Sequence, residues 1–147
     1  MLEKTKSLLS KNYDLTAPRG VFLSLFDHDK KLLCSNGVLF TDKSLDEVVS
    51  GLYTTLTSQH PTTHFVGIDI VLDSQQETNP QQIANINTQK YGIYVYSQGS
   101  DTSGVILPNT QNINDISSAI QAIKQKTNIG GQAEIYTFTT ERIIVAL

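Results

Sequence analysis

Cys34 is the clearest candidate for a nucleophile in this chain, because it supplies the only thiol in 147 residues. A reactive cysteine needs a lowered pKa, which a nearby cation or a helix N-terminus provides. The preceding Leu32 and Leu33 are apolar, so the alternative is a small hydrophobic residue on a buried strand. A single cysteine also excludes an intrachain disulfide and a cysteine-rich zinc site.

The three histidines, His28, His60 and His64, do not form a metal-ligand motif. His60 and His64 could flank a pocket together, but extended chain separates them too widely for an easily shared ion. His28 stands between Asp27 and Asp29, and two carboxylates beside an imidazole could bind a cation. Asp-His-Asp is also ordinary turn chemistry, so we expect neither a metal site nor a cofactor.

Asp69 and three tyrosines are weaker candidates for a site. A carboxylate buried at Asp69 would need a partner and could belong to a site, whereas an exposed strand face explains it more simply. Tyr91, Tyr94 and Tyr96 could form a stacking surface for a base or sugar. Aromatic residues on strands also commonly pack within the sheet.

The first strands position Cys34. Gly20–Phe26 is largely apolar on both faces, which predicts a central, covered strand. A second strand is expected near Lys31–Ser35, followed at Asn36-Gly37 by either a type I′ hairpin turn or a simple bend. His64–Asp73 alternates, which predicts a strand with one fully apolar face.

Two helices are expected. Ser44–Ser58 begins with a capping-box pair, Ser44 and Glu47, and should pack on the Gly20–Phe26 strand. Its apolar stripe includes Val48, Val49, Leu52 and Leu56. A second helix over Asn114–Lys126 carries a stripe of isoleucines, and Gly130-Gly131 should help to end it.

The later chain predicts further strands. Ser74–Gln89 is polar and is expected to be a surface connection with a short helical turn. Tyr91–Ser97 and Gly104–Leu107 should form a hairpin. A last strand is expected over Ala133–Thr139, with an extension to Val145.

The summed pattern predicts an α+β fold with a mostly antiparallel sheet of about five to six strands and two to three helices. Residues 1–147 are expected to form a single domain, with residues 1–18 as an N-terminal extension that is partly helical or loose.

Composition narrows the classes of function. The net charge is -3 and the 11 basic residues are scattered, which disfavours a nucleic-acid partner. No apolar run approaches the roughly 20 residues that cross a membrane. The N-terminal segment, Met1–Asn12, is charged and interrupted, so we do not expect it to be a signal peptide. We therefore expect a cytoplasmic protein.

Several segments, in the right order, are similar to the motifs of one known family. Arg19–Leu25 is similar to an Arg-Gly-Val-Phe-Val-Thr-Leu strand. Tyr91–Val95 and Gly104–Pro108 resemble His-Gly-Leu-Ile-Val and Gly-Leu-Leu-Leu-Pro. Lys126 falls at the lysine of a Cys-x-Lys-Ala-Gly helix end, and Tyr136–Glu141 resembles a closing Tyr-x-Phe-x-x-Glu. Together these segments resemble the AMMECR-one domain family, the protein A component of the AmmeMemoRadiSam group.

The chain departs from this family at its hallmark, Leu-Arg-Gly-Cys-Ile-Gly. The corresponding segment is Lys-Leu-Leu-Cys-Ser-Asn-Gly over Lys31–Gly37. Aligning the cysteines loses the other hallmark residues, whereas a shift by one keeps the Leu and the final Gly but places Ser35 at the cysteine position. Neither register retains the arginine, and the family's Asp-x-Arg-Phe-Pro-Pro segment is also missing.

The resemblance implies that the chain keeps the family's fold but lacks most residues of its hallmark motif. We expect a non-catalytic binding or assembly module for a protein partner, such as a Memo-like or a radical S-adenosylmethionine protein. The alternative is an enzyme or enzyme subunit with its site at Cys34, linked to RNA modification or radical S-adenosylmethionine chemistry. Cys34 is then the candidate catalytic residue, and the candidate binding residues are Ser35, Asn36, Gly37 and Lys126.

Overall fold

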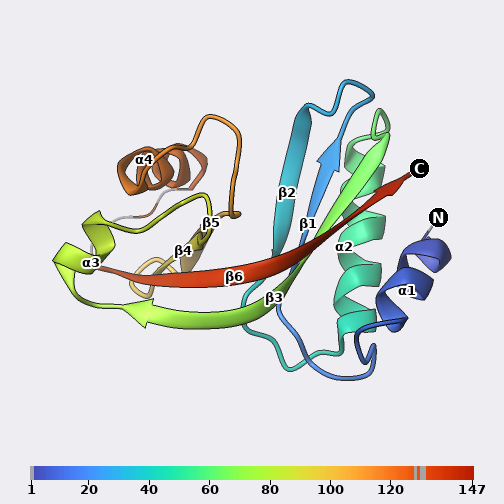
Figure 1. Ribbon diagram of the computed structural model, residues 1–147, viewed down its shortest axis with the longest axis horizontal. Coiled ribbons are helices and arrows are strands. Elements are labelled where there is room, and N and C mark those ends of the chain that lie inside the picture. The colour runs from blue at the N-terminus through green and yellow to red at the C-terminus, as the bar shows by residue number, and fades with distance from the viewer. Residues whose placement is uncertain (1, 128, 130–131) are drawn as a thin grey trace. The chain divides into compact units, whose positions relative to one another are not determined.

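The computed structural model describes residues 2–127, 129 and 132–147. Within these residues the chain has four helices and six strands, which makes it an α+β protein as predicted (Figure 1). The helices are α1 (Leu2–Ser10), α2 (Leu45–Gln59), α3 (Pro80–Ala84) and α4 (Ile116–Lys126). The strands are β1 (Val21–Phe26), β2 (Leu32–Val38), β3 (Phe65–Glu77), β4 (Gly92–Ser97), β5 (Thr102–Ile106) and β6 (Ala133–Ala146).

The prediction of two to three helices is too low, because both short segments, α1 and α3, are helical. The strands form one sheet in the order β2-β1-β3-β6-β4-β5. The pairings β1–β2, β1–β3, β4–β5 and β4–β6 are antiparallel. No helix among the described residues has the length and apolar content needed to cross a membrane.

The chain divides into two compact units. Unit 1 comprises residues 2–71 together with Glu141–Leu147, and unit 2 comprises Leu72–Thr140. Each unit is a sheet segment with its own hydrophobic core. That the whole chain acts as one AMMECR-one-like domain stays a prediction.

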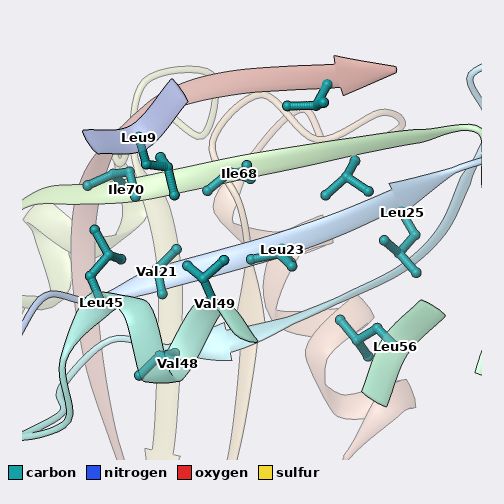
Figure 2. Packing of buried hydrophobic residues seen from close by; sticks show 12 residues of the cluster. Leu9, Val21, Leu23, Leu25, Leu45, Val48, Val49, Leu56, Ile68 and Ile70 are labelled. Carbon is teal, nitrogen blue, oxygen red and sulfur yellow. The ribbon is translucent and has the colours of Figure 1, made fainter. Parts of the chain in front are cut away.

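The core of unit 1 confirms the central position of β1 and the packing of α2. β1 lies between β2 and β3, with the side chains of Val21, Leu23 and Leu25 fully buried (Figure 2). From α2, Val48, Val49 and Leu56 are buried in the same cluster, while Leu52 is half-buried beside it. Leu9 brings α1 into this core, and the predicted extension 1–18 is therefore partly helical and packed.

Both alternatives predicted at Asn36-Gly37, a hairpin turn and a simple bend, are wrong, because the two residues lie inside β2. They pair with Leu23 and Phe22 of β1. The turn falls earlier, where the Asp27 carboxylate accepts the backbone N–H groups of Asp29 and Lys31. A Cβ atom at position 37 would overlap the backbone of Val21 and Phe22, so close approach of the strands accounts for the glycine.

β3 is longer than predicted, and β6 includes the extension that was predicted for the last strand. β3 continues past Asp73 to Glu77, so the first part of the expected surface connection, Ser74–Gln89, is strand. β6 runs without interruption from Ala133 to Ala146. The polar end of β3 is exposed on both faces, and alternation therefore could not reveal it.

Unit 2 is built from the predicted β4–β5 hairpin and α4. Ile93, Val95, Ile106 and Ile123 are buried in its core. Asp115 caps α4, where its carboxylate accepts the backbone N–H of Ser118 at 2.8 Å. α4 ends at Lys126; Gly130 and Gly131 lie outside the described residues.

Candidate functional site

Cys34 lies on the core side of β2. It is opposite Leu25 in the β1–β2 register and packs, half-buried, against the hydrophobic core of unit 1. Burial raises the pKa of the Cys34 thiol, and a hydrogen bond from the Leu25 backbone opposes this only in part. The thiol is therefore held in its protonated, less nucleophilic form at neutral pH.

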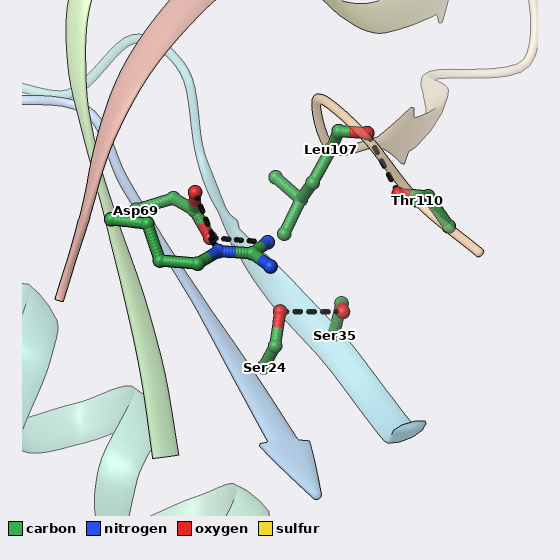
Figure 3. Close-up of polar contacts among 6 residues, drawn as sticks. Ser24, Ser35, Asp69, Leu107 and Thr110 are labelled. Carbon is green, nitrogen blue, oxygen red and sulfur yellow. Dashed lines mark hydrogen bonds and ion pairs between the residues drawn. The ribbon is translucent and has the colours of Figure 1, made fainter. Parts of the chain in front are cut away.

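The other candidates on β2 are divided between the two faces of the strand. Ser35 faces away from the core, and its hydroxyl lies 2.9 Å from that of Ser24 on β1 (Figure 3). Asn36 is exposed, and its Oδ1 accepts the backbone N–H of Gly37 at 2.8 Å. These contacts satisfy polar groups locally, and among the described residues the Nδ2 donor of Asn36 is left for a partner.

Lys126 belongs to unit 2, whereas the four candidates on β2 belong to unit 1. It occupies the last turn of α4 and is exposed. A cation at this position complements the negative end of the helix dipole, which gives Lys126 a structural role of its own.

Asp69 is buried rather than on the exposed face that we expected. It is only 1% exposed and faces away from α2 (Figure 3). Arg142 of β6 binds it through Nε, 3.1 Å from each carboxylate oxygen, and through Nη2, 2.9 Å from Oδ2. This bidentate pair matches both groups in charge and geometry, so it anchors the end of β6 within unit 1.

Two of the histidines lie close to each other. The ring of His64 lies near that of His28, with centroids 5.6 Å apart. His28 Nε2 is 3.2 Å from the carboxylate of Asp29. The Asp27 carboxylate is bound to backbone N–H groups of its own turn, which supports the interpretation of this segment as turn chemistry.

A cleft on unit 2 is lined mainly by polar side chains. Its two adjoining parts have volumes of about 500 and 290 Å³ and share Gln75, Tyr91 and Thr137. Thr137 and Thr139 of β6 line it beside Asp73 and Gln75 of β3. We call this hollow the polar cleft.

The remaining lining comes from the chain between β3 and β4. Gln82 of α3 with Asn85 and Asn87 lines one part, and Lys90 lines the other. Lys90 Nζ lies 5.2 Å from the centroid of the Tyr91 ring. Glu77 is half-buried, and its Oε1 accepts from Thr137 at 2.8 Å and from Gln75 at 2.6 Å.

Among these residues, the sequence singled out only Tyr91. Tyr94 and Tyr96 lie on β4 and face the same side of the strand, whereas Tyr91 precedes β4. Tyr94 packs with Tyr136, with ring centroids 6.0 Å apart. The signal that could have found the cleft is the density of Gln and Asn over residues 75–89.

No family model matches the chain, and no curated protein matches it either. Among solved structures, the uncharacterized protein PH0010 from Pyrococcus horikoshii is similar, with a TM-score of 0.70. The similarity covers 88% of this chain and 75% of that chain, at 16% sequence identity. The two proteins share a fold.

Proposed function

We propose that this chain is a non-catalytic binding or assembly module of the AMMECR-one type that acts with a protein partner. The family motifs lie on elements that form as expected: the Arg-Gly-Val-Phe run leads into β1, and the later motifs fall on β4, β5 and β6. The partner class that the resemblance suggests is a Memo-like or a radical S-adenosylmethionine protein.

The environment of Cys34 is the main support for a non-catalytic role. A thiol nucleophile needs access and a lowered pKa, whereas Cys34 packs against the core and burial raises its pKa. Its hydrogen-bond partner is a backbone N–H of β1 and not a general base. This supports a binding role over an enzyme with its site at Cys34.

Two exposed predicted residues give the first test. Asn36 and Lys126 are both exposed, so replacing either with alanine should leave the fold intact. We expect Asn36→Ala or Lys126→Ala to weaken binding of a purified Memo-like or radical S-adenosylmethionine protein in isothermal titration. Lys43→Ala, also exposed, is the matched control. Failure of the wild-type chain to bind either protein would contradict this partner class.

Cys34→Ala gives the second test. We expect it to bind the partner as the wild type does, because the thiol takes no part in chemistry. Loss of a cellular phenotype in Cys34→Ala, with the free energy of unfolding unchanged, would overturn the non-catalytic proposal.

A further inference from the structure

We propose that the polar cleft of unit 2 binds an extended peptide segment that carries a basic side chain. This inference rests on the proposed function as a protein-binding module, and it assigns the surface and the chemistry of the partner segment.

The amide groups of the cleft match a peptide backbone. A carboxamide presents an acceptor and a donor side by side, and in an extended chain the N–H and C=O of one residue also point to the same side, so the carboxamide can bind both groups of that residue. Four carboxamides line the cleft, and all four are exposed: Gln75, Gln82, Asn85 and Asn87. An extended segment would find partners for its N–H and C=O groups along this row.

Hydrogen bonds among the described residues use one end of each of three of these amides. Gln75 donates through Nε2 to Glu77, and Asn85 donates through Nδ2 to the carbonyl of Gln81. Asn87 accepts through Oδ1 from the N–H of Gln89 at 3.0 Å. The oxygens of Gln75 and Asn85 therefore suit peptide N–H groups, and the Asn87 amide nitrogen suits a carbonyl.

The charges that line the cleft favour a basic side chain on the bound peptide. Asp73 and Glu77 contribute two carboxylates, and Lys90 contributes one ammonium group, which lies over the Tyr91 ring. The lining thus has an excess of one negative charge at neutral pH. A lysine or arginine on the bound segment would complement it, whereas an acidic segment would be repelled.

The size of the cleft suits a few residues of peptide. Its larger part, about 500 Å³, falls in the range of sites that bind small ligands. Phe138 and Thr137, 1% and 3% exposed, and the half-buried Tyr91 belong to its less accessible lining, whereas Asp73, Gln75 and Lys90 are exposed. A segment that lies across the cleft would contact apolar surface at Tyr91 and polar groups on either side.

Selection from a displayed library of random linear peptides, followed by affinity measurement on synthesised peptides, tests this proposal. We expect the selected peptides to be enriched in lysine or arginine. Asp73→Asn and Gln82→Ala change exposed side chains and should each weaken binding about fivefold, the usual worth of one hydrogen bond. Asp42→Asn and Gln111→Ala are matched exposed controls outside the cleft and should bind as the wild type does.

Replacing the basic residue of a selected peptide by alanine should weaken binding to the wild type but not weaken it further in Asp73→Asn, because the two changes remove the same contact. Equal binding by the cleft variants and the controls would overturn the inference. The inference would also be overturned if the library selection enriched no peptide, or if the cleft bound glycans on a glycan array but bound no peptide.

The partner titration separates this inference from the proposed function. If a protein partner binds the wild type and the cleft variants equally, the cleft is not its site, and the module function stands. If no protein partner binds but basic peptides do, the peptide site stands, and the proposed partner class fails.

Discussion

At the scale of single residues, the buried ion pair of unit 1 joins two residues that lie 73 positions apart in the chain. Asp69 on β3 and Arg142 on β6 meet only after the strands are placed, so no local pattern joins them. Burial differs between the partners: the side chain of Asp69 is 2% exposed and that of Arg142 is 33% exposed. The cost of breaking the pair should therefore depend on which partner is removed.

Replacing Arg142 should destabilise the protein more than replacing Asp69. Arg142→Ala leaves a buried carboxylate without its cation, which typically costs about 3 to 5 kcal/mol. Asp69→Asn leaves a guanidinium that water already reaches, so its cost should be smaller. Urea unfolding of both variants measures the difference. An equal or larger loss for Asp69→Asn would show that the carboxylate is not what needs compensation.

The thiol of Cys34 should react slowly with iodoacetamide. Burial raises its pKa, so less thiolate is present at neutral pH, and the rate should rise only at a higher pH than for a free cysteine. Alkylation rates across pH, followed by mass spectrometry against glutathione as a control, give the profile. A rate at pH 7 above that of glutathione would contradict this picture and favour the enzyme alternative.

At the scale of elements, the periodicity of apolar residues correctly predicted the helices and strands that have a buried face. α2 follows from its apolar stripe and the capping pair of Ser44 and Glu47, and β1 follows from its two apolar faces. The predictions that were wrong rested on sequence patterns that fit more than one structure. Asn36-Gly37 is a common turn dipeptide, yet here the glycine admits a neighbouring strand, and the exposed end of β3 has no buried face to alternate with.

The core of α2 predicts a graded response to truncation of its leucines. Leu56 is buried against β1, so Leu56→Ala should lower the free energy of unfolding by about 2 to 5 kcal/mol. Leu52 is half-buried, so Leu52→Ala should cost less. Chemical denaturation of the two variants decides this. If Leu52→Ala proves the more damaging, α2 is rotated relative to its position here.

The cap of α4 predicts a dependence on pH. Backbone and side-chain hydrogen bonds from Ser118 lower the pKa of Asp115 in the folded state. A carboxyl group with a lowered pKa stabilises the fold above its unfolded pKa of about 3.9, and this contribution is lost as the pH falls through the folded value. Asp115→Asn keeps a capping oxygen but cannot titrate. The stability advantage of the wild type over Asp115→Asn should therefore shrink below about pH 4; an advantage that grows there would contradict the assignment.

At the scale of the whole molecule, the composition and order of elements were enough to predict the α+β class, but not the division of the chain. Unit 1 is discontinuous, since it takes its last strand segment, Glu141–Leu147, from the far end of the sequence. In that segment, Val145 packs in the core and Arg142 forms the ion pair with Asp69. Contacts made by a sequence-distant strand leave no periodic trace, which is why the Asp69 pair and the polar cleft emerged only from the structure.

Removing Glu141–Leu147 should therefore disrupt unit 1 although most of that unit lies at the other end of the chain. The truncation deletes the 2% exposed Val145 from the core and leaves the Asp69 carboxylate without Arg142. It also deletes the Leu147 backbone N–H that donates to His64 at 2.8 Å. Deletion of Leu147 alone removes only that last contact and serves as the control. In a two-dimensional amide NMR spectrum, we expect the β1 and α2 resonances to lose dispersion in the long truncation and to keep it in the control. Native-like β1 and α2 signals in the long truncation would show that residues 2–71 fold without their final strand.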